Sequence, residues 1–361
     1  MGKWAIAPLL TSVILLGFTI AIKIDDLSHR QATADLEVLL AELDRSDLMV
    51  STDLSNPDDF LFLASTGSQA LNRALAYAPE HRQRIDSVLF ALAAWVASPG
   101  NLRQWRRGAN WDREVFFLAH AGATLGHYQL ATRDLTFEDA FKSIGEHLGR
   151  RLERGRYKHL LSRPDEDFYR PADNAAALYT LSLYDEFYGT DFTLSNFRDW
   201  SRYLADELYY VESRLPCAAF SETNRCHLEP NATATGLYIA YRAAARPAEV
   251  TDDVPWREWL HYFGTSSMSP FSLGIRPGMR DGREARYCDA AAYPAHCDHY
   301  EEAVGLWAAA EYGGSYTYYR LYATNALRRW FFADTNYGAM RPTARVQGLT
   351  RVAIRGIAEG T

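Results

Sequence analysis

Apolar side chains recur at steps of three and four residues along most of this chain, which is the spacing of one face of an amphipathic α-helix. Strict alternation, the mark of a half-buried strand, is confined to short segments such as Ala344–Gln347. The pattern therefore predicts an all-α protein. The segments with helical spacing are Ser68–Ala78, Arg82–Ala97, Trp111–Ala131, Thr136–Arg154, Pro171–Gly189, Asn196–Glu212, Asn231–Ala245, Trp256–Phe263, Asp298–Tyr312 and Tyr316–Phe332.

Helix boundaries and connection lengths limit the choice among all-α architectures. Asn110 is suited to cap a helix, Pro171 suits a first helical position, and Asp298 to Glu301 has the spacing of a capping box. No repeat of fixed length is present, which argues against a regular solenoid. Helices joined by short connections predict an (α/α)6-type toroid, in which the chemistry would lie at the starts of the inner helices.

The N-terminus carries an uncharged apolar run from Trp4 to Ile22, between Lys3 and Lys23. As a helix, such a run would be roughly 28 Å long, about the thickness of a bilayer's hydrocarbon core. It lacks the small-x-small cleavage site of a secretory signal. We therefore predict an N-terminal transmembrane helix that contacts the cell membrane through residues 4–22, with a cleaved signal peptide or a buried helix as alternatives. The two flanking lysines leave the orientation undecided.

These patterns divide the chain into four parts. Residues 1–24 form the predicted membrane anchor or signal, and residues 25–50 a stalk or first helix. Residues 51–340 form the toroid domain, and residues 341–361 a C-terminal tail.

Composition excludes some classes of partner. The chain is 48% hydrophobic and 23% charged, an ordinary globular balance. Its net charge is −7, and it has no basic tract beyond short runs such as Arg106-Arg107, so we expect no nucleic-acid partner. Aromatic residues are abundant, with 22 Tyr and 9 Trp, which suits a cavity that binds a small molecule or glycan. Composition does not indicate an oligomeric state.

The four cysteines form two pairs of the same spacing. Cys217 and Cys226 are separated by eight residues, as are Cys288 and Cys297. An even count and short local spacing predict two disulfides, which persist in an oxidising compartment. Zinc sites use shorter gaps between cysteines, so we expect no metal and no other cofactor, although zinc binding and free thiols remain alternatives. With the anchor, the disulfides predict an extracytoplasmic domain, periplasmic or extracellular.

Two predicted helix starts carry candidate catalytic groups. His120 and His127 are seven residues apart and share one helix face, behind Trp111. Histidine titrates near neutral pH and serves as a general acid or base. Asp173 and Asn174 lie at the start of the predicted helix Pro171–Gly189. We predict that Asp173 and both histidines are catalytic, and that Trp111, Asn174 and the nearby Tyr169 bind substrate. Each also has a structural reading, as a core residue or a helix-start anion.

Further candidates lie in the two cysteine loops. The first loop contains Glu222, and the second contains Asp289 and Tyr293, with His299 following. We predict that Glu222 and Asp289 are catalytic carboxylates, and that Tyr293 and His299 bind substrate. A polar disulfide loop is equally compatible with a role as surface structure.

The run Tyr169-Arg170-Pro171-Ala172-Asp173-Asn174, followed by Leu178, Leu181 and Asp185, resembles the helix opening of linalool dehydratase/isomerase-like proteins. The segments Pro230–Leu237 and Ala303–Gly314 extend the similarity over about residues 110–330. The resemblance implies an α/α toroid that is membrane-attached or secreted, and dehydration of a tertiary alcohol by cysteines, a histidine and an aspartate. This chain departs from the pattern because no cysteine stands near Asp173.

Three functions fit these observations. The first is an enzyme that cleaves or eliminates a C–O bond, in a saccharide above all, by carboxylate and histidine acid-base chemistry. The second, implied by the resemblance, is a dehydratase or isomerase acting on a small terpenoid-type alcohol in a dry, apolar cavity. The third is a non-catalytic glycan-binding or scaffold protein of the cell envelope.

Overall fold

The computed structural model describes residues 3–45, 57–98, 111–154, 159–162, 167–245, 247, 254–266, 273–276, 278, 294–331, 340 and 342–360. These residues are mainly helical. The helices are α1 (Lys3–Leu27), α2 (Arg30–Leu43), α4 (Pro57–Tyr77), η1 (Pro79–His81), α5 (Arg82–Ala97), η2 (Trp111–Arg113), α7 (Val115–Thr132), α8 (Glu138–Arg154), α9 (Pro171–Tyr188), α10 (Phe192–Tyr203), η3 (Leu204–Leu208), α11 (Ala232–Ala244), α12 (Val254–Phe263), α13 (Pro294–Glu311), α14 (Ser315–Phe331) and α15 (Pro342–Glu359).

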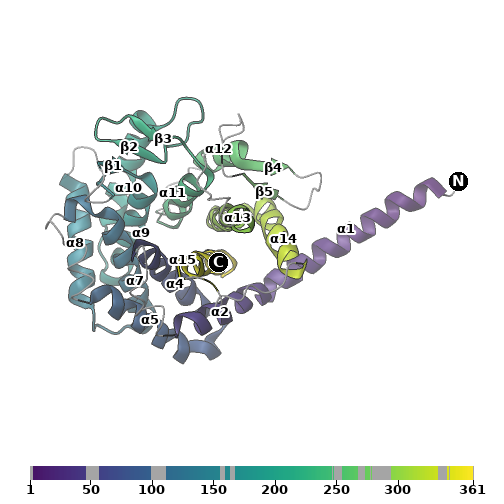
Figure 1. The fold of residues 1–361 in the computed structure, drawn as a ribbon, viewed down its shortest axis with the longest axis horizontal. Helices are drawn as coiled ribbons and strands as arrows, with labels where there is room; N and C mark the ends of the chain where they lie inside the picture. The colour runs from purple at the N-terminus through teal and green to yellow at the C-terminus, as the bar shows by residue number, and fades with distance from the viewer. Residues whose placement is uncertain are drawn as a thin grey trace.

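Within the described residues, six helices form a closed inner ring. Each packs on the next in the order α4, α7, α9, α11, α13 and α15, and α15 packs back on α4. Helices α2, α5, α8, α10, α12 and α14 lie around this ring (Figure 1). Because inner and outer helices alternate along the chain, the structure confirms the predicted α/α toroid.

Inner and outer helices differ in burial as their positions require. Helix α7 is buried on all sides over most of its length, whereas α8 buries one apolar face and exposes charged residues. Small residues let the inner helices approach closely. A Cβ atom at Gly122 would lie 2.4 Å from Thr180 of α9, a distance that atoms do not tolerate. This contact explains the glycine at position 122 of α7.

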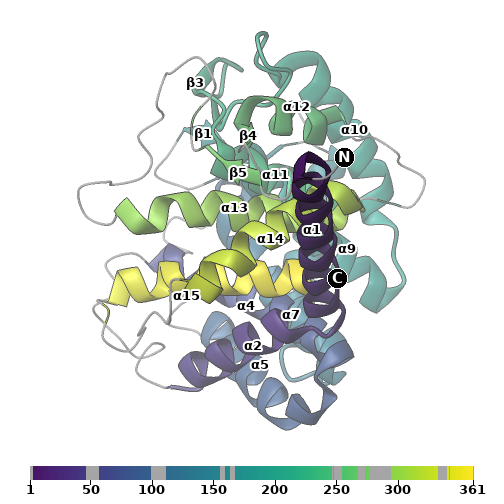
Figure 2. The ribbon, with the colours of Figure 1, turned by 90° about the vertical axis from the view of Figure 1, so that its right-hand side faces the viewer.

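Helix α1 projects away from the toroid, while its C-terminal end is docked on it (Figures 1 and 2). Tyr322 of α14 and Gln31 each donate a hydrogen bond to the buried Asp25 carboxylate, both at 3.0 Å. Tyr318 donates to Asp26 at 2.7 Å. No helix in the part of the chain that the structure describes is long and apolar enough to cross a membrane. The side chains of residues 1–13 and 15 lie outside that part, so the anchor stays a prediction.

The helices near both ends of the chain pack on the toroid. Helix α2, predicted to be a stalk or first helix within residues 25–50, packs on α4 and α15 as an outer helix of the toroid. Residues 341–361, predicted to be a C-terminal tail, contain α15, which has Val346, Leu349 and Ile357 fully buried. The helix closes the inner ring and belongs to the domain. Its regular spacing of apolar residues is a helical signal that the prediction left unused.

Short strands interrupt the helices, which the periodicity did not predict. Antiparallel β1 (Phe168–Tyr169), β2 (Ala219–Ser221) and β3 (Cys226–Leu228) form one sheet, and β4 (Gly264–Ser266) pairs with β5 (Leu273–Ile275). Strands of two or three residues are too short to show alternation. The predicted disulfide between Cys217 and Cys226 is confirmed, and it closes the loop that contains β2.

Candidate functional site

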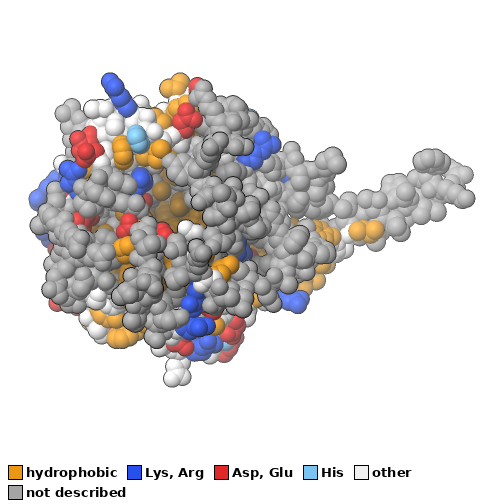
Figure 3. Space-filling model, viewed as in Figure 1, with side chains coloured by type: hydrophobic (Ala, Val, Ile, Leu, Met, Phe, Trp, Pro, Cys, Tyr) orange, Lys and Arg blue, Asp and Glu red, His pale blue; other side chains and the backbone are white. Residues whose placement is uncertain are grey.

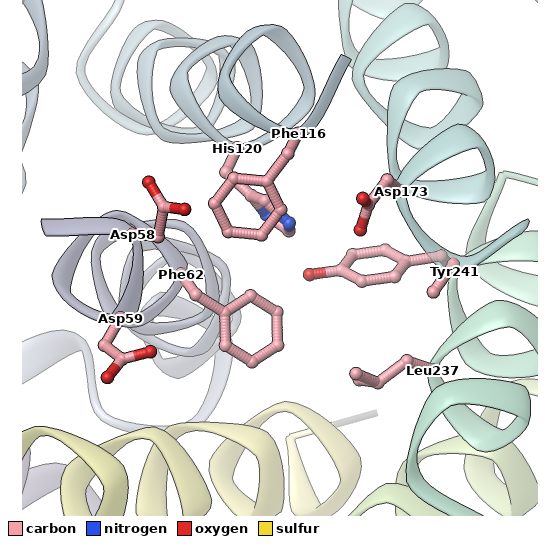
Figure 4. Close-up of a pocket in the computed structure, with 9 residues that line it drawn as sticks. Asp58, Asp59, Phe62, Phe116, His120, Asp173, Leu237 and Tyr241 are labelled. Atoms are coloured by element: carbon pink, nitrogen blue, oxygen red, sulfur yellow. The ribbon is translucent and has the colours of Figure 1, made fainter. Parts of the chain in front are cut away.

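A cavity of about 160 Å³ lies between the N-terminal parts of the inner helices α4, α7 and α9 and the middle of α11 (Figure 4). In the space-filling view, hydrophobic and acidic side chains are visible in the central hollow of this face (Figure 3). The toroid thus gathers side chains from distant parts of the sequence. The cavity is lined by Asp58, Asp59, Phe62, Phe116, His120, Ala172, Asp173, Leu237 and Tyr241.

Carboxylates stand on opposite walls of this cavity. Asp58 and Asp59 lie in the first turn of α4, and Asp173 lies in the first turn of α9. Asp58 and Asp173 face one another across the aromatic side chains (Figure 4). Asp58 is half-buried, whereas Asp173 is only 7% exposed. Each acid also interacts favourably with the positive end of its helix, which is the local reason for its place in a first turn.

His120 lies between the two walls and is enclosed by aromatic rings. Its ring centroid is 4.6 Å from that of Phe116 and 5.0 Å from that of Phe62, both edge to face. Its Nδ1 atom is 3.2 Å from the Ser65 hydroxyl oxygen. Since these contacts hold the ring in one orientation, the imidazole is prepositioned beside the carboxylates.

Tyr241 extends from α11 toward the middle of the cavity, between Phe62 and Asp173 (Figure 4). Burial raises the pKa of Tyr241 well above its usual value, and the charge of Asp173 raises it further, while a hydrogen bond with Ser65 acts in the opposite direction. The phenol therefore stays protonated at physiological pH. It is a hydrogen-bond donor for a ligand oxygen rather than a base.

His127 lies outside the cavity lining, and its place does not favour the predicted catalytic role. Its Nε2 atom is 3.0 Å from the Tyr179 hydroxyl, and its Nδ1 atom is 3.1 Å from the Asn72 amide nitrogen. Complete burial, with a smaller contribution from the positive charge of Arg73, lowers the pKa of His127 to about 3. A histidine that stays neutral and has both nitrogens engaged acts as a core residue.

Asn174, predicted to bind substrate, instead ties two backbone segments together. Its Oδ1 atom accepts a hydrogen bond from the Leu160 backbone nitrogen at 2.8 Å, and its Nδ2 atom donates to the Leu160 oxygen at 3.0 Å. The adjoining residues, Leu161 and Ser162, accept hydrogen bonds from the first residues of α7. Asn174 therefore aligns the starts of α7 and α9, and its amide is used within the fold.

The other candidates are dispersed. Tyr169 packs edge to face on His159, with ring centroids 4.1 Å apart, and does not line the cavity. Glu222 is exposed in the turn between β2 and β3. Trp111 lies in η2, beside a second cavity formed with α8. Of the predicted residues that the structure describes, it brings together Asp173 and His120 alone.

The candidate residues of the second cysteine loop lie outside the part of the chain that the structure describes. Cys288, Asp289 and Tyr293 are outside the described residues, and so are the side chains of Cys297 and His299. Within the described ranges, no group of three or more His, Cys, Asp and Glu side chains is arranged to hold a metal ion.

Sequence reasoning missed Asp58, Asp59, Phe62 and Tyr241. The signal at the first two was present, because Pro57-Asp58-Asp59 has proline at a first helical position and acids in the first turn. The predicted helix nonetheless began only at Ser68. Tyr241 lies in the third turn of its helix, where local sequence does not distinguish a cavity residue from a core residue.

Comparisons with known proteins support the toroid. No family model and no curated protein matches the chain. Two solved structures of an alpha-1,6-mannanase, GH76A of Salegentibacter sp. HEL1_6, are similar to it, each at 10% identity with a TM-score of 0.59. One covers 92% of this chain and 99% of the mannanase. The other covers 91% of this chain and 99% of the mannanase. It is an inactive variant, in which two consecutive aspartates are replaced by asparagine, in complex with alpha-1,6-mannotriose.

At this identity the likeness shows the fold alone. The solved structures are mannanases, and nothing in them supports the resemblance to linalool dehydratase/isomerase or the hydro-lyase reaction.

Proposed function

We propose that this protein is a glycoside hydrolase that cleaves a saccharide in the cavity between the inner helices α4, α7, α9 and α11. The observation that carries the proposal is the placement of Asp58 and Asp173 on facing walls of an aromatic-lined cavity. Glycoside hydrolysis uses two carboxyl groups on either side of the scissile bond. Aromatic rings such as Phe62 and Tyr241 suit the apolar faces of a sugar.

We assign different roles to the two carboxyl groups because their surroundings differ. Asp173 is the more buried, and desolvation favours the neutral carboxyl, so we propose that it donates a proton to the glycosidic oxygen. Asp58 is half-buried, and we propose that it either attacks the anomeric carbon or activates a water. Tyr241 would donate a hydrogen bond to a substrate hydroxyl, and His120 would hold the ring plane of Phe116.

The mannanase structures suggest the substrate class. The inactive mannanase lacks two consecutive aspartates and binds alpha-1,6-mannotriose. This chain has the consecutive pair Asp58 and Asp59 in its cavity. We therefore propose an α-linked mannoside as the first substrate to test, with Asp59 supporting the charge or orientation of Asp58.

The test is hydrolysis of α-1,6-mannan oligosaccharides by the purified full chain. We expect Asp58→Asn and Asp173→Asn each to lower kcat by about 10²- to 10⁴-fold, the usual contribution of an acid or base. Asp139→Asn is the matched control, since Asp139 is also a first-turn aspartate but lies on the outer helix α8. Full activity in both cavity variants would refute the assignment. NMR detection of the first product anomer would show whether the reaction retains or inverts configuration.

We further propose that α1 anchors the protein in a membrane and places the toroid outside the cytoplasm. Support comes from the projection of α1 away from the toroid and from the exposed Ile14, Leu16 and Ile20 on it. Membrane fractions washed with alkaline carbonate should retain the full chain, and added protease should reach the toroid in intact spheroplasts. Release of the chain by the wash would contradict the anchor.

A further inference from the structure

A second cavity, of about 450 Å³, opens at the same end of the toroid as the candidate active site. One wall is η2, which leads directly into the first turn of α7, where Phe116 lines the candidate active site. The other wall is the C-terminal half of α8. The volume of this second cavity is within the range of small-molecule sites. The two cavities therefore share the segment that begins α7.

Positive charge dominates the α8 wall. Arg150, Arg151 and Arg154 line the cavity within two turns of the helix, against a single carboxylate in the lining, Glu146. Lys and Arg side chains are visible along this edge of the molecule in Figure 3, where α8 lies in Figure 1. Arg150 pairs with Glu146 four residues before it, an exposed contact of small energy. Arg154 makes no ion pair within the described residues.

The opposite wall presents an aromatic surface in a fixed position. Trp111 stands edge to face with His147 of α8, with ring centroids 5.4 Å apart. The neighbouring Asp112 carboxylate is 3.2 Å from His147 Nε2 and 3.1 Å from Arg151 Nε. On the other side, Arg113 pairs with Asp167. Asp112 ties η2 to α8, and Arg113 ties it to Asp167, so Trp111 is held in the lining of the same cavity as the arginines.

Arginines in the last turn of a helix also interact favourably with the helix dipole. The dipole does not account for a tryptophan held on the opposite wall of a cavity of this size. Arginine side chains bind phosphate and carboxylate oxygens in a two-pronged geometry, while an indole ring suits the apolar face of a sugar. The combination fits a sugar that carries a negative charge.

We propose that this second cavity is a subsite for a negatively charged sugar unit, whose anionic group contacts Arg150 and Arg154 and whose ring lies on Trp111. The saccharide part rests on the proposed function, because a glycan bound in the candidate active site would extend along η2 into this cavity. The protein would then select glycans with phosphate or carboxylate substituents near the scissile bond.

The test is calorimetric binding of mannose 6-phosphate to the full chain in detergent, in the Asp58→Asn background. The measurement needs no turnover, so failure of the hydrolase proposal does not affect it. We expect Arg150→Ala combined with Arg154→Ala to weaken binding at least tenfold, and Trp111→Ala to weaken it severalfold. Lys142→Ala, on the same helix but outside the cavity, should leave binding unchanged.

Parallel titrations distinguish the possible ligands. Unphosphorylated mannose should bind more weakly than mannose 6-phosphate by the same factor that the arginine variant loses. Inorganic phosphate that binds as tightly as mannose 6-phosphate would overturn the sugar part of the proposal. Arginine-dependent binding to phosphatidylglycerol vesicles, without binding of mannose 6-phosphate, would identify a membrane-facing surface and overturn it as well. The proposal would also be overturned if the wild-type protein and the double variant, Arg150→Ala with Arg154→Ala, bound mannose 6-phosphate equally well.

Discussion

His127 should make the stability of this protein depend on pH between about 3 and 6.5. In the folded state its pKa is about 3, against an ordinary value of 6.5. The unfolded chain therefore binds a proton more readily as the pH falls, and each unit of pKa difference corresponds to about 1.4 kcal/mol. The depressed pKa contributes stability that is complete above pH 6.5 and is lost as the pH falls toward 3.

The structure gives the size of this effect. The full pKa difference corresponds to about 5 kcal/mol, of which about 2 kcal/mol would be lost between pH 7 and pH 5. The cause is burial, because a charged imidazolium in this position has no water. Protonated Nδ1 would also point an N–H at the Asn72 amide nitrogen, 3.1 Å away.

The assay is urea unfolding of the wild-type chain and a His127→Gln variant at pH 7 and pH 5. Glutamine does not titrate, so other ionisable groups cancel when the two pH dependences are subtracted. We expect the wild type to lose about 2 kcal/mol more than the variant on acidification. The same loss in both proteins, or an NMR titration of the folded His127 ring near pH 6.5, would refute the reasoning.

Three further variants test the packing and cross-linking of the toroid. Asn174→Ala should lower the free energy of unfolding by about 2–4 kcal/mol, because buried backbone groups lose their partner; a loss in substrate affinity with unchanged unfolding would instead support direct binding. Replacing Cys217 and Cys226 together by serine should cost about 2.5 kcal/mol in a chemical unfolding curve, and wild-type stability under reducing conditions would contradict this. Gly145→Ala should cost about 1–3 kcal/mol, since its Cβ would lie 2.2 Å from Tyr184, and an unchanged melting temperature would show that the ring yields.

The local signals in this sequence were sufficient for the fold class. Helical periodicity depends on neighbours three and four residues apart, so it identified most inner and outer helices without tertiary information. The spacing of Cys217 and Cys226 indicated their disulfide for the same reason, since the loop between them is short. Helix α15 shows the limit, because an amphipathic segment at the end of a chain looks the same whether it is packed or peripheral.

The candidate cavity depends on how the inner helices pack on one another. Asp58 and Asp173 are far apart in the sequence, and each alone is explained by its place at the start of a helix. The packing of α4 and α9 on α7, and of α11 on α9, sets these starts around one space. His120 and His127 share a helix face, yet the depth of each along α7 separates a cavity residue from a core residue. That depth is a property of the assembled ring, and no local pattern encodes it.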